Sequence, residues 1–481
     1  MINVFPFADF PIAVFGLGRS GMATARALVR SEAEVWAWDD DEEARERARE
    51  EGIPLVDLYV CDWKELTTLV LSPGIPLHHP KPHRIVELAL GAHCEIIGDI
   101  ELLARAQRDA SYIGITGTNG KSTTTALIGH VMQVSGRDAE VGGNLGIPAL
   151  ALEPMEIGGT YVLEMSSFQL ELTKSITFDV AVLSNISADH LDRYGGMDDY
   201  IAAKKSIFHR QSKPRTAVVG VDDPLSRAVY DELKATDEQV VIGISGSERV
   251  HGGVYVIDGR LYDDTEGTEV PVMNLNGIAA LPGSHNWQNA AAAYAAVKSA
   301  GVPSPVAMAC INSYPGLVHR QEPVAMIDGI AYVNDSKATN GDAAARALAC
   351  YDAVYWIAGG RPKEGGLKPT MPYLKNVRHA FLIGEAALAF SQFLDGKVPS
   401  TLAGDLATAM KAARKLAKKE KIAGAVVLLS PACASFDQFD NFEDRGDAFR
   451  AMVEKLPGKH LDPIEVPGGF PGTGVREKVH P

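Results

Sequence analysis

Short apolar runs alternate with amphipathic stretches along almost the whole chain. Near the N-terminus, the run Ile12–Phe15 is followed by a glycine-rich turn, by the alanine-rich stretch Met22–Arg30, and by a second run, Glu34–Trp38. Apolar runs of this length between turn signals are typical of buried strands, and longer periodic stretches are typical of helices. The pattern predicts a βαβ unit at the start of the chain.

The same alternation continues to the C-terminal region, where it fades into a tail rich in glycine and proline after Pro457. Residues 245–280 are rich in Gly, Asp, Val and Tyr, which predicts hairpins. Strands that alternate with helices favour parallel sheets covered by helices, so the fold class is expected to be α/β. Further strands are predicted at Leu69–Leu71, Tyr112–Ile115, Tyr161–Leu163, Val180–Leu183, Ala217–Val219, Ala331–Val333, Val354–Ile357, Ala380–Ile383 and Val426–Leu429.

Composition excludes several classes of protein. The 481 residues are 46% hydrophobic, and the net charge of -15 argues against a broad surface for nucleic acid or for anionic membranes. No apolar run approaches the ~18 residues of a membrane span, and the N-terminus lacks the pattern of a signal peptide, so a cytoplasmic location is expected. The five cysteines include no CxxC pair, which favours reduced thiols over disulfides or a zinc site.

A phosphate-binding loop is the strongest single motif. The strand Tyr112–Ile115 runs into Gly117-Thr118-Asn119-Gly120-Lys121-Ser122 and then into a helix. Glycines let backbone N–H groups turn toward a phosphate, Lys121 can reach the β- and γ-phosphates, and Ser122 can ligate Mg²⁺. The spacing departs from the usual motif, because Ile115 stands where the first glycine belongs. The alternative is a tight turn with a solvated lysine.

Two polar residues follow other predicted strands. Glu164 ends the strand Tyr161–Leu163, and His190 lies in a polar stretch after Val180–Leu183. A carboxylate at a strand end beside a phosphate loop is well placed for Mg²⁺, and His190 could be a second ligand. The alternatives are a surface acid and a structural histidine.

The N-terminal turn Gly16-Leu17-Gly18-Arg19-Ser20-Gly21 is a weaker signal. It could bind NAD, with Asp39 or Asp40 on the ribose, or the diphosphate of another nucleotide such as a UDP-sugar, which the arginine in the loop would favour. It could also be a simple packing turn.

Taken together, the ordered motifs resemble the Mur ligase family over nearly the whole chain, from Gly16 to about Arg450. The stretches that carry the resemblance are Gly16–Gly21, Leu71–Ile75, Gly114–Thr124, Gly143–Pro148, Val162–Leu172, Asp189–Tyr194, Ala202–Lys204, Leu281–Ala291, His319–Arg320, Asn334–Asn340, Gly359–Lys363 and Leu429–Phe442.

The resemblance implies three domains. Residues 1–108 would form a Rossmann-like domain for a UDP-linked substrate, and residues 109–315 a central P-loop ATPase-like domain with a parallel sheet. Residues 316–481 would form a Rossmann-like domain for an amino acid, together with the tail. The implied activity is ATP-dependent amide-bond formation in peptidoglycan precursor synthesis by way of an acyl phosphate.

The resemblance also implies the partners. The stretches around Lys337 and Ser435 favour addition of D-glutamate to UDP-N-acetylmuramoyl-L-alanine, with ATP and Mg²⁺ as cofactors and with no nucleic acid or membrane partner. A monomer is expected.

Residue roles follow from the same resemblance. Lys121, Glu164, His190 and Lys204 would be catalytic, and Ser122, Glu164, His190 and a carbamylated Lys204 would hold the metal. The motif Ala202-Ala203-Lys204 favours Lys204 over its neighbour Lys205. The residues that would bind ATP are Gly117, Thr118, Asn119, Gly120, Lys121, Ser122, Thr123, Asn289, Arg320 and Asp335.

The residues implied for binding the two remaining substrates come from different parts of the chain. A dicarboxylate such as D-glutamate needs cations and hydroxyl groups, which several of these side chains supply. The residues implied for the UDP substrate are Gly18, Arg19, Ser20, Asp39, Ser72 and Asn144. Those implied for D-glutamate are Lys337, Thr339, Lys363, Ser435 and Phe442.

Three alternatives remain open from the sequence. Another amino-acid-adding ligase, such as a sibling of the same family or a folylpolyglutamate synthase, would share the central loop. An NAD-dependent oxidoreductase would use Gly16–Gly21 but would leave Gly117–Ser122 without a purpose. A non-catalytic nucleotide-binding regulator would bind ATP without releasing ADP.

Overall fold

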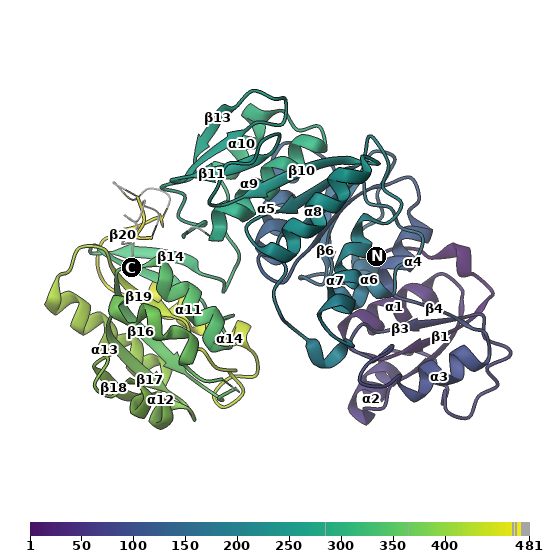
Figure 1. The fold of residues 1–481 in the computed structure, drawn as a ribbon. Coiled ribbons are helices and arrows are strands. Elements are labelled where there is room, and N and C mark those ends of the chain that lie inside the picture. Colours follow the sequence, from purple (N-terminus) through teal and green to yellow (C-terminus); the bar gives the residue numbers. More distant parts are fainter. Residues whose placement is uncertain (284, 364, 464–465, 467–468, 473–481) are drawn as a thin grey trace. The chain divides into compact units, whose positions relative to one another are not determined.

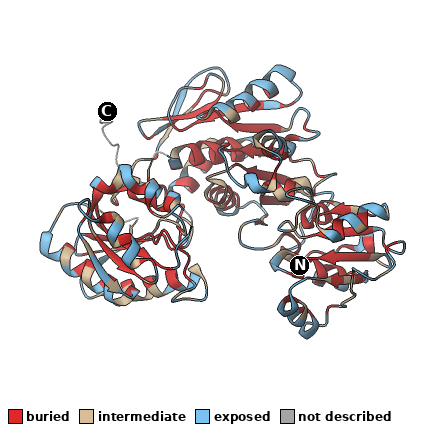
Figure 2. Ribbon diagram, turned by 60° about the horizontal axis from the view of Figure 1, so that its bottom comes forward, coloured by how far each residue is buried: buried red, intermediate tan, exposed pale blue. Residues whose placement is uncertain are grey.

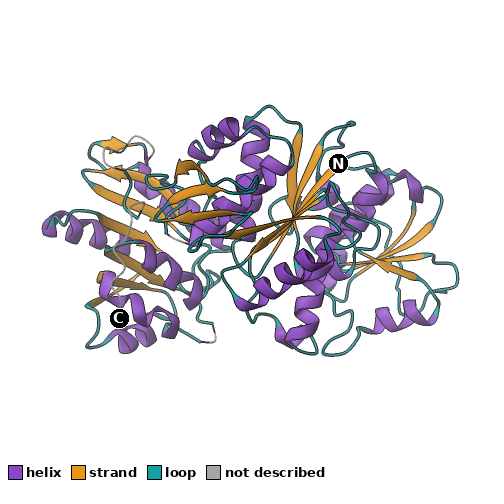
Figure 3. Ribbon diagram, turned by 45° about the horizontal axis from the view of Figure 1, so that its top comes forward, coloured by secondary structure: helices purple, strands orange, loops and turns teal. Residues whose placement is uncertain are grey.

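The computed structural model describes residues 1–283, 285–363, 365–463, 466 and 469–472. Over these residues the chain forms three β-sheets with helices packed on them (Figure 1, Figure 3). It divides into two compact units. The first contains residues 1–257, 262–272 and 288–311, and the second contains residues 258–261, 273–287 and the chain from Asn312 onward.

The N-terminal sheet has four parallel strands in the order β2-β1-β3-β4. Its two inner strands are buried along almost their whole length, as expected for strands that helices cover on both faces (Figure 2). The elements are β1 (Pro11–Phe15), α1 (Arg19–Arg30), β2 (Glu34–Trp38), α2 (Glu42–Glu50), β3 (Thr68–Leu71), α3 (Arg84–Gly91), β4 (Glu95–Ile97) and α4 (Asp99–Ala106).

Glycine closes the turn between β1 and α1. Gly16 has a φ of +90°, and a Cβ at Gly21 would lie only 1.7 Å from the carbonyl oxygen of Gly16. Only glycine fits at this approach, which brings the first turn of α1 against the end of β1. The N–H groups at the start of α1 therefore point to the carboxyl edge of the sheet.

The central sheet has nine strands among the described residues, in the order β13-β12-β11-β10-β9-β8-β5-β7-β6. The strands from β6 to β11 pair in parallel. β5 lies where the chain changes direction across the sheet, with β7 on one side and β8 on the other. In open α/β sheets such a switch point is the usual place for a ligand.

The elements of the central region are β5 (Ser111–Thr116), α5 (Lys121–Val134), β6 (Ala139–Gly143), β7 (Thr160–Glu164), α6 (Ser167–Glu171), β8 (Val180–Leu183), α7 (Met197–Lys205), β9 (Thr216–Gly220), α8 (Pro224–Thr236), β10 (Val240–Ser245), β11 (Val254–Ile257), β12 (Arg260–Asp263), β13 (Val270–Asn274), α9 (His285–Ser299) and α10 (Ser304–Asn312). The predicted hairpin region supplies β11, β12 and β13. Asp258 and Gly259 both have positive φ, 49° and 77°, which a two-residue hairpin turn requires.

The C-terminal sheet has seven strands within the described ranges, in the order β18-β17-β16-β19-β15-β14-β20. Five are parallel, whereas β14 pairs antiparallel with both β15 and β20. The elements are β14 (Glu322–Ile327), β15 (Ile330–Asn334), α11 (Gly341–Cys350), β16 (Ala353–Gly359), β17 (Val377–Ile383), α12 (Ala387–Leu394), β18 (Ser400–Gly404), α13 (Leu406–Glu420), β19 (Ala425–Leu429), α14 (Phe442–Glu454) and β20 (His460–Leu461).

Separate hydrophobic cores cover the two faces of the C-terminal sheet. Along β16, Val354 and Trp356 belong to one core, and Tyr355 and Ile357 to the other. This alternation follows from the pleat of a strand, and all four side chains are fully buried. The sheet is therefore the rigid centre of the second unit.

The predicted α/β class with parallel sheets is confirmed, because parallel strands dominate all three sheets. The antiparallel strands β14 and β20 were not foreseen. β20 is too short to show an apolar run, and it places part of the predicted tail on the sheet edge beside β14. Among the described residues, no helix is both long enough and apolar enough to cross a membrane. The division at residues 108 and 315 stays a prediction.

Truncating a buried strand residue of the second unit should lower the stability of the chain. Leu428 in β19 is 0% exposed, so Leu428→Ala should lower the free energy of unfolding by about 2–5 kcal/mol through a residual cavity. Leu402→Ala is the matched control, because Leu402 in β18 is 57% exposed and its loss should change stability by less than about 0.5 kcal/mol. Urea denaturation followed by circular dichroism measures both, and equal effects would contradict the assigned core.

Candidate functional site

The loop between β5 and α5 is shaped to receive a phosphate. Gly117 and Gly120 have positive φ, at 145° and 81°, and Gly120 caps α5 in a left-handed conformation. A Cβ at Gly120 would lie 2.2 Å from Oδ1 of Asn289 in α9, so only glycine fits there. This backbone directs the N–H groups at the start of α5 into the loop, where they can bind an anion. Ser122 and Thr123 follow in the first turn of α5.

The loop is fixed by the end of the neighbouring strand. The N–H of Thr118 donates to the carbonyl oxygen of Asn185 (2.8 Å), and the N–H of Asn119 donates to its side-chain Oδ1 (2.9 Å). The amide of Asn185 donates back to the carbonyl oxygen of Asn119 (3.1 Å). Asn185 is a site residue that the sequence did not reveal, although its position after β8 was a signal.

Two lysines converge on one carbonyl group of this loop. Nζ of Lys121 donates to the carbonyl oxygens of Gly117 (2.8 Å) and Thr118 (2.9 Å). Nζ of Lys204 donates to the same Gly117 oxygen (2.8 Å) and lies 4.6 Å from the ring centre of Tyr200. Lys204 is only 2% exposed, and burial together with the charge of Lys121 lowers its pKa to about 7.

Lys205 takes no part in this arrangement. It forms an ion pair with Glu232, with both side chains partly exposed. Of the two adjacent lysines, the structure therefore places Lys204 against the phosphate loop. A buried amine with a pKa near neutrality is in part uncharged, which is the form that reacts with carbon dioxide.

Glu164 ends β7 with one oxygen unsatisfied. Its Oε1 accepts a hydrogen bond from the amide of Asn144 (2.5 Å), whereas its Oε2 is buried and has no partner among the described residues. The N–H of Asn144 also donates to the carbonyl oxygen of Glu164 (2.9 Å). A buried carboxylate oxygen without a donor fits a bound cation such as Mg²⁺, which prefers oxygen ligands.

His190 lies apart from Glu164, on a surface loop. Its side chain is 55% exposed, its φ is 52°, and its ring lies 5.4 Å from that of Phe168. Among the described residues, no three His, Cys, Asp or Glu side chains are close enough together to hold a metal ion.

The N-terminal glycine turn lies next to the loop that carries Asn144. Oγ of Ser72 donates to the carbonyl oxygen of Gly16 (2.7 Å), and Arg19 donates to that of Gly146, two residues after Asn144. The carboxylate of Asp39 accepts from the N–H of Leu17 (2.5 Å), so Asp39 is fixed against the turn. Gly18 caps α1, and Ser20 lies in its first turn. Of the predicted UDP-site residues, Asn144 contacts Glu164 rather than the turn.

The predicted D-glutamate residues form two contacting pairs in the second unit. Nζ of Lys337 lies 3.9 Å from the ring centre of Phe442, and Nζ of Lys363 donates to Oγ1 of Thr339 (3.4 Å). Ser435 is buried on the loop after β19. These contacts bring together residues from the loops after β15 and β16 and from the start of α14, which lie far apart in sequence.

Arg445 links the loop after β15, which carries Lys337 and Thr339, to the loop after β19, which carries Ser435. Its buried guanidinium donates to the oxygen atoms of Ser336 (3.0 and 2.9 Å), to Cys433 (3.1 Å) and to Ala434 (3.3 Å). Burial lowers its pKa to about 10. Nothing in the sequence pointed to Arg445, because an arginine in an amphipathic helix is ordinarily solvated.

Arg320 and Asp335 also belong to the second unit. Asp335 follows β15 and is 5% exposed; Oγ of Ser430 (2.8 Å) and the N–H of Gln321 (3.1 Å) donate to its carboxylate. Burial raises the pKa of Asp335 to about 7. Arg320 stands beside Gln321, so both predicted residues lie around one short turn.

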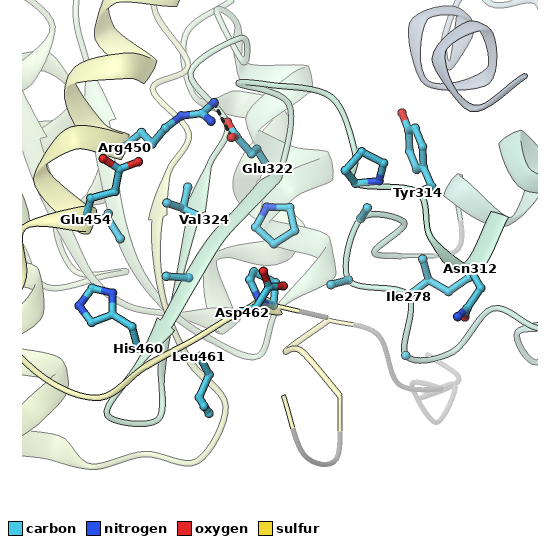
Figure 4. Close-up of a pocket in the computed structure, with 18 residues that line it drawn as sticks. Ile278, Asn312, Tyr314, Glu322, Val324, Arg450, Glu454, His460, Leu461 and Asp462 are labelled. Carbon is cyan, nitrogen blue, oxygen red and sulfur yellow. Dashed lines mark ion pairs between the residues drawn. The ribbon is translucent and has the colours of Figure 1, made fainter. Parts of the chain in front are cut away.

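A cavity of about 530 Å³ in the second unit is lined in part by Glu322, which follows this turn in the chain (Figure 4). Inside it, Arg450 pairs with Glu322 (2.5 Å), whose other oxygen accepts from the N–H of His319 (2.8 Å) and from the amide of Asn334 (2.9 Å). None of the predicted site residues lines the cavity. Through His319 and Asn334, the ion pair supports the residues next to Arg320 and Asp335.

Comparison with known proteins gives a consistent result. Residues 115–297 match the Mur ligase middle domain. The chain is 51% identical to the UDP-N-acetylmuramoylalanine–D-glutamate ligase of Rhodospirillum rubrum, over 98% of this chain and 99% of that protein. It is 49% identical to the ligase of the same name from Phenylobacterium zucineum, over 96% and 100%.

Solved structures show the same fold at low identity. The UDP-N-acetylmuramate–alanine ligase of Thermotoga maritima matches with a TM-score of 0.54 at 16% identity, covering 92% of this chain and 99% of that one. A pseudomurein peptide ligase type C from Methanothermus fervidus matches with a TM-score of 0.52 at 18% identity, covering 93% and 100%.

The depressed pKa of Lys204 predicts a pH-dependent stability. The folded-state pKa is about 7 and the ordinary value is 10.5, so the unfolded chain binds more protons between these values. Stability therefore rises with pH across this window, because the cost of burying the charge disappears. Relative to that of Lys204→Met, the free energy of unfolding of the wild type should rise by up to about 1.4 kcal/mol per pH unit above pH 7.

Urea denaturation between pH 7 and pH 10, in buffers free of carbon dioxide, measures this difference. Lys205→Met is the matched control and should follow the wild-type profile. Parallel profiles for the wild type and Lys204→Met would contradict the buried, uncharged amine.

Proposed function

The chain belongs to the Mur ligase family, and we propose that it joins D-glutamate to UDP-N-acetylmuramoyl-L-alanine at the expense of ATP. The single observation that carries the proposal is 51% identity over 98% of the chain to a ligase with that substrate pair in its name. The local geometry supports it, because the first unit has a glycine loop suited to phosphate and an unsatisfied carboxylate, and the second unit has two lysines on loops that follow β15 and β16.

ATP would be held mainly by the first unit. The N–H groups of Gly117, Thr118, Asn119 and Gly120 would surround its phosphates, with Lys121, Ser122 and Thr123 in the first turn of α5. Asn289 supports the loop through the close approach at Gly120. The remaining nucleotide contacts would come from Arg320 and Asp335.

Mg²⁺ fits the oxygen groups around this loop. Glu164 offers a buried oxygen without a hydrogen-bond partner among the described residues, and Ser122 offers a hydroxyl group. His190 and Lys204 would complete the set, the latter after carbamylation of its uncharged amine. When bound, the ion neutralises negative charge on the phosphates and on the attacking carboxylate.

The UDP-linked substrate would bind at the N-terminal turn. Gly18, Arg19 and Ser20 present the start of α1 to a diphosphate, and Asp39 and Ser72 hold the turn in shape. Asn144, which donates to Glu164, lies on the loop that Arg19 contacts. This loop would lead from the diphosphate site toward the phosphate loop, where the alanyl carboxylate has to react.

D-glutamate would bind to Lys337, Thr339, Lys363, Ser435 and Phe442. Two carboxylates require two cationic partners, and Lys337 and Lys363 supply them. The ring of Phe442 restricts the ammonium of Lys337, because a cation above an aromatic face is attracted by the ring.

The residues support a two-step reaction. The alanyl carboxylate attacks the γ-phosphorus of ATP and gives an acyl phosphate and ADP; Lys121 and the N–H groups of the loop offset the repulsion between the two anions. The uncharged amine of D-glutamate then attacks the acyl carbon, and phosphate leaves from the tetrahedral intermediate. Because an acyl phosphate hydrolyses readily, water must be excluded before the amine arrives. We also propose that residues 1–108, 109–315 and 316–481 act as three domains of a monomer.

Release of ADP and phosphate should require both UDP-N-acetylmuramoyl-L-alanine and D-glutamate, with ATP and Mg²⁺ present. Lys121→Ala should reduce this turnover at least ~10²-fold, because a positioned cation at the transferred phosphate is lost, and calorimetry should still detect binding of the UDP substrate. Lys205→Ala is the neighbouring control and should keep its activity. No phosphate release by the wild type with both substrates would refute the proposed function.

Phe442→Leu should weaken the use of D-glutamate alone. Loss of the ring frees the ammonium of Lys337, and the KM for D-glutamate should rise roughly 3- to 10-fold while the KM for the UDP substrate stays unchanged. Phe393→Leu is the matched control, since Nζ of Lys397 lies 5.2 Å from the Phe393 ring on α12, outside the predicted site. A similar rise in both KM values would contradict this assignment.

A further inference from the structure

One arginine of the first unit contacts both the metal-site loop and the turn of the UDP site, and no role assigned above uses it. Arg193 ends the short 3-10 helix Leu191–Arg193, which His190 caps. Its N–H donates to the carbonyl oxygen of His190 (2.9 Å), so its backbone closes the turn that presents that histidine.

The guanidinium of Arg193 lies between an aromatic ring and a backbone carbonyl. Its Cζ is 4.7 Å from the ring centre of Phe168, and NH1 donates to the carbonyl oxygen of Gly74 (3.0 Å). Gly74 belongs to the turn Ser72-Pro73-Gly74-Ile75, whose first residue holds the carbonyl group of Gly16. One side chain thus spans from the His190 loop to the turn that shapes the diphosphate site.

The ring of Phe168 packs against several residues of the His190 loop. Its ring lies 5.4 Å from that of His190 and stacks on Tyr194 at 5.9 Å with an interplanar angle of 9°. Phe168 is the second residue of α6, which begins three residues after Glu164. The ring therefore connects His190 and Arg193 with the chain segment that carries the other predicted metal ligand.

One donor of Arg193 is still unused. Its Nε is buried and has no hydrogen-bond partner among the described residues. A buried N–H without an acceptor costs about 1–3 kcal/mol, so its retention needs a reason. A lysine could reproduce only part of these contacts, because stacking on Phe168 while donating sideways to Gly74 needs a planar group with several donors.

We propose that Arg193 is a positioning residue that couples occupancy of the UDP-substrate turn to the placement of His190. A ligand that fixes the Ser72–Ile75 turn also fixes the Gly74 carbonyl group, and through Arg193 it fixes the loop of His190. By reciprocity, a ligand that fixes His190 strengthens binding at the turn. The inference rests on the proposed function, because it takes the UDP substrate as the ligand of that turn.

The test is a measurement of coupling. Calorimetry gives the Kd of UDP-N-acetylmuramoyl-L-alanine with and without Mg²⁺ and a non-hydrolysable ATP analogue, for the wild type, Arg193→Met and Arg193→Lys. In the wild type the Mg²⁺ nucleotide should tighten binding severalfold. The ratio of the Kd without nucleotide to the Kd with nucleotide measures this coupling. In Arg193→Met this ratio should fall to about one, and the Kd without nucleotide should rise roughly tenfold through loss of a charge-assisted hydrogen bond. Arg193→Lys should retain part of the coupling.

Arg249→Met is the matched control, since Arg249 also lies above an aromatic ring, that of Tyr262 at 6.0 Å, but on the loop before β11. It should keep the wild-type ratio. A wild-type ratio in Arg193→Met overturns the inference and leaves the proposed function intact. Should Arg193→Met fail to fold, a wild-type ratio in Arg193→Lys overturns it equally. A wild type that binds no UDP substrate refutes the proposed function itself.

Discussion

The convergence of two ammonium groups on the carbonyl oxygen of Gly117 is the interaction on which the catalytic arrangement depends. Lys121 and Lys204 both donate to this oxygen, so two like charges meet on one backbone group. Their repulsion adds to the cost of burying Lys204, and together these effects bring its pKa to about 7. The arrangement is favourable only where a polyanion is to be bound, and the glycines of the loop make it possible by giving Gly117 and Gly120 their positive φ.

Two further groups are costly to bury, one in each unit. Oε2 of Glu164 is buried without a donor among the described residues, and burial raises the pKa of Asp335 to about 7. Each group costs stability, which the apolar cores of the sheets have to offset. Sequences fold best when every local choice agrees with the fold, so departures of this kind are expected where function requires them.

The sequence predicted the sheets more completely than the site. The buried strand Val180–Leu183 has the bounds that its apolar run indicates, because burial on both faces leaves a continuous signal. The glycine turn before α5 was equally clear, since Gly117 and Gly120 stand within one short segment between a strand and a helix. Asn185, Arg193 and Arg445 gave no comparable signal. Each acts by contacting segments far away in the sequence, and only the fold determines those contacts. The same holds for β20, whose two residues are a strand only because β14 presents a free edge.

Charge explains how a dicarboxylate can be selected in the second unit of a chain with a net charge of -15. Arg445 is buried between the loops of Ser336 and Cys433, and its hydrogen bonds all go to neutral oxygens rather than to a carboxylate. Its charge is therefore not neutralised at hydrogen-bond distance by any described residue. In a medium of low polarity such a charge acts over a longer range than a solvated one. Together with Lys337 and Lys363 it makes the region between the two loops favourable for two negative charges. At the proposed D-glutamate site, this field would favour a ligand with two carboxylates over a ligand with one.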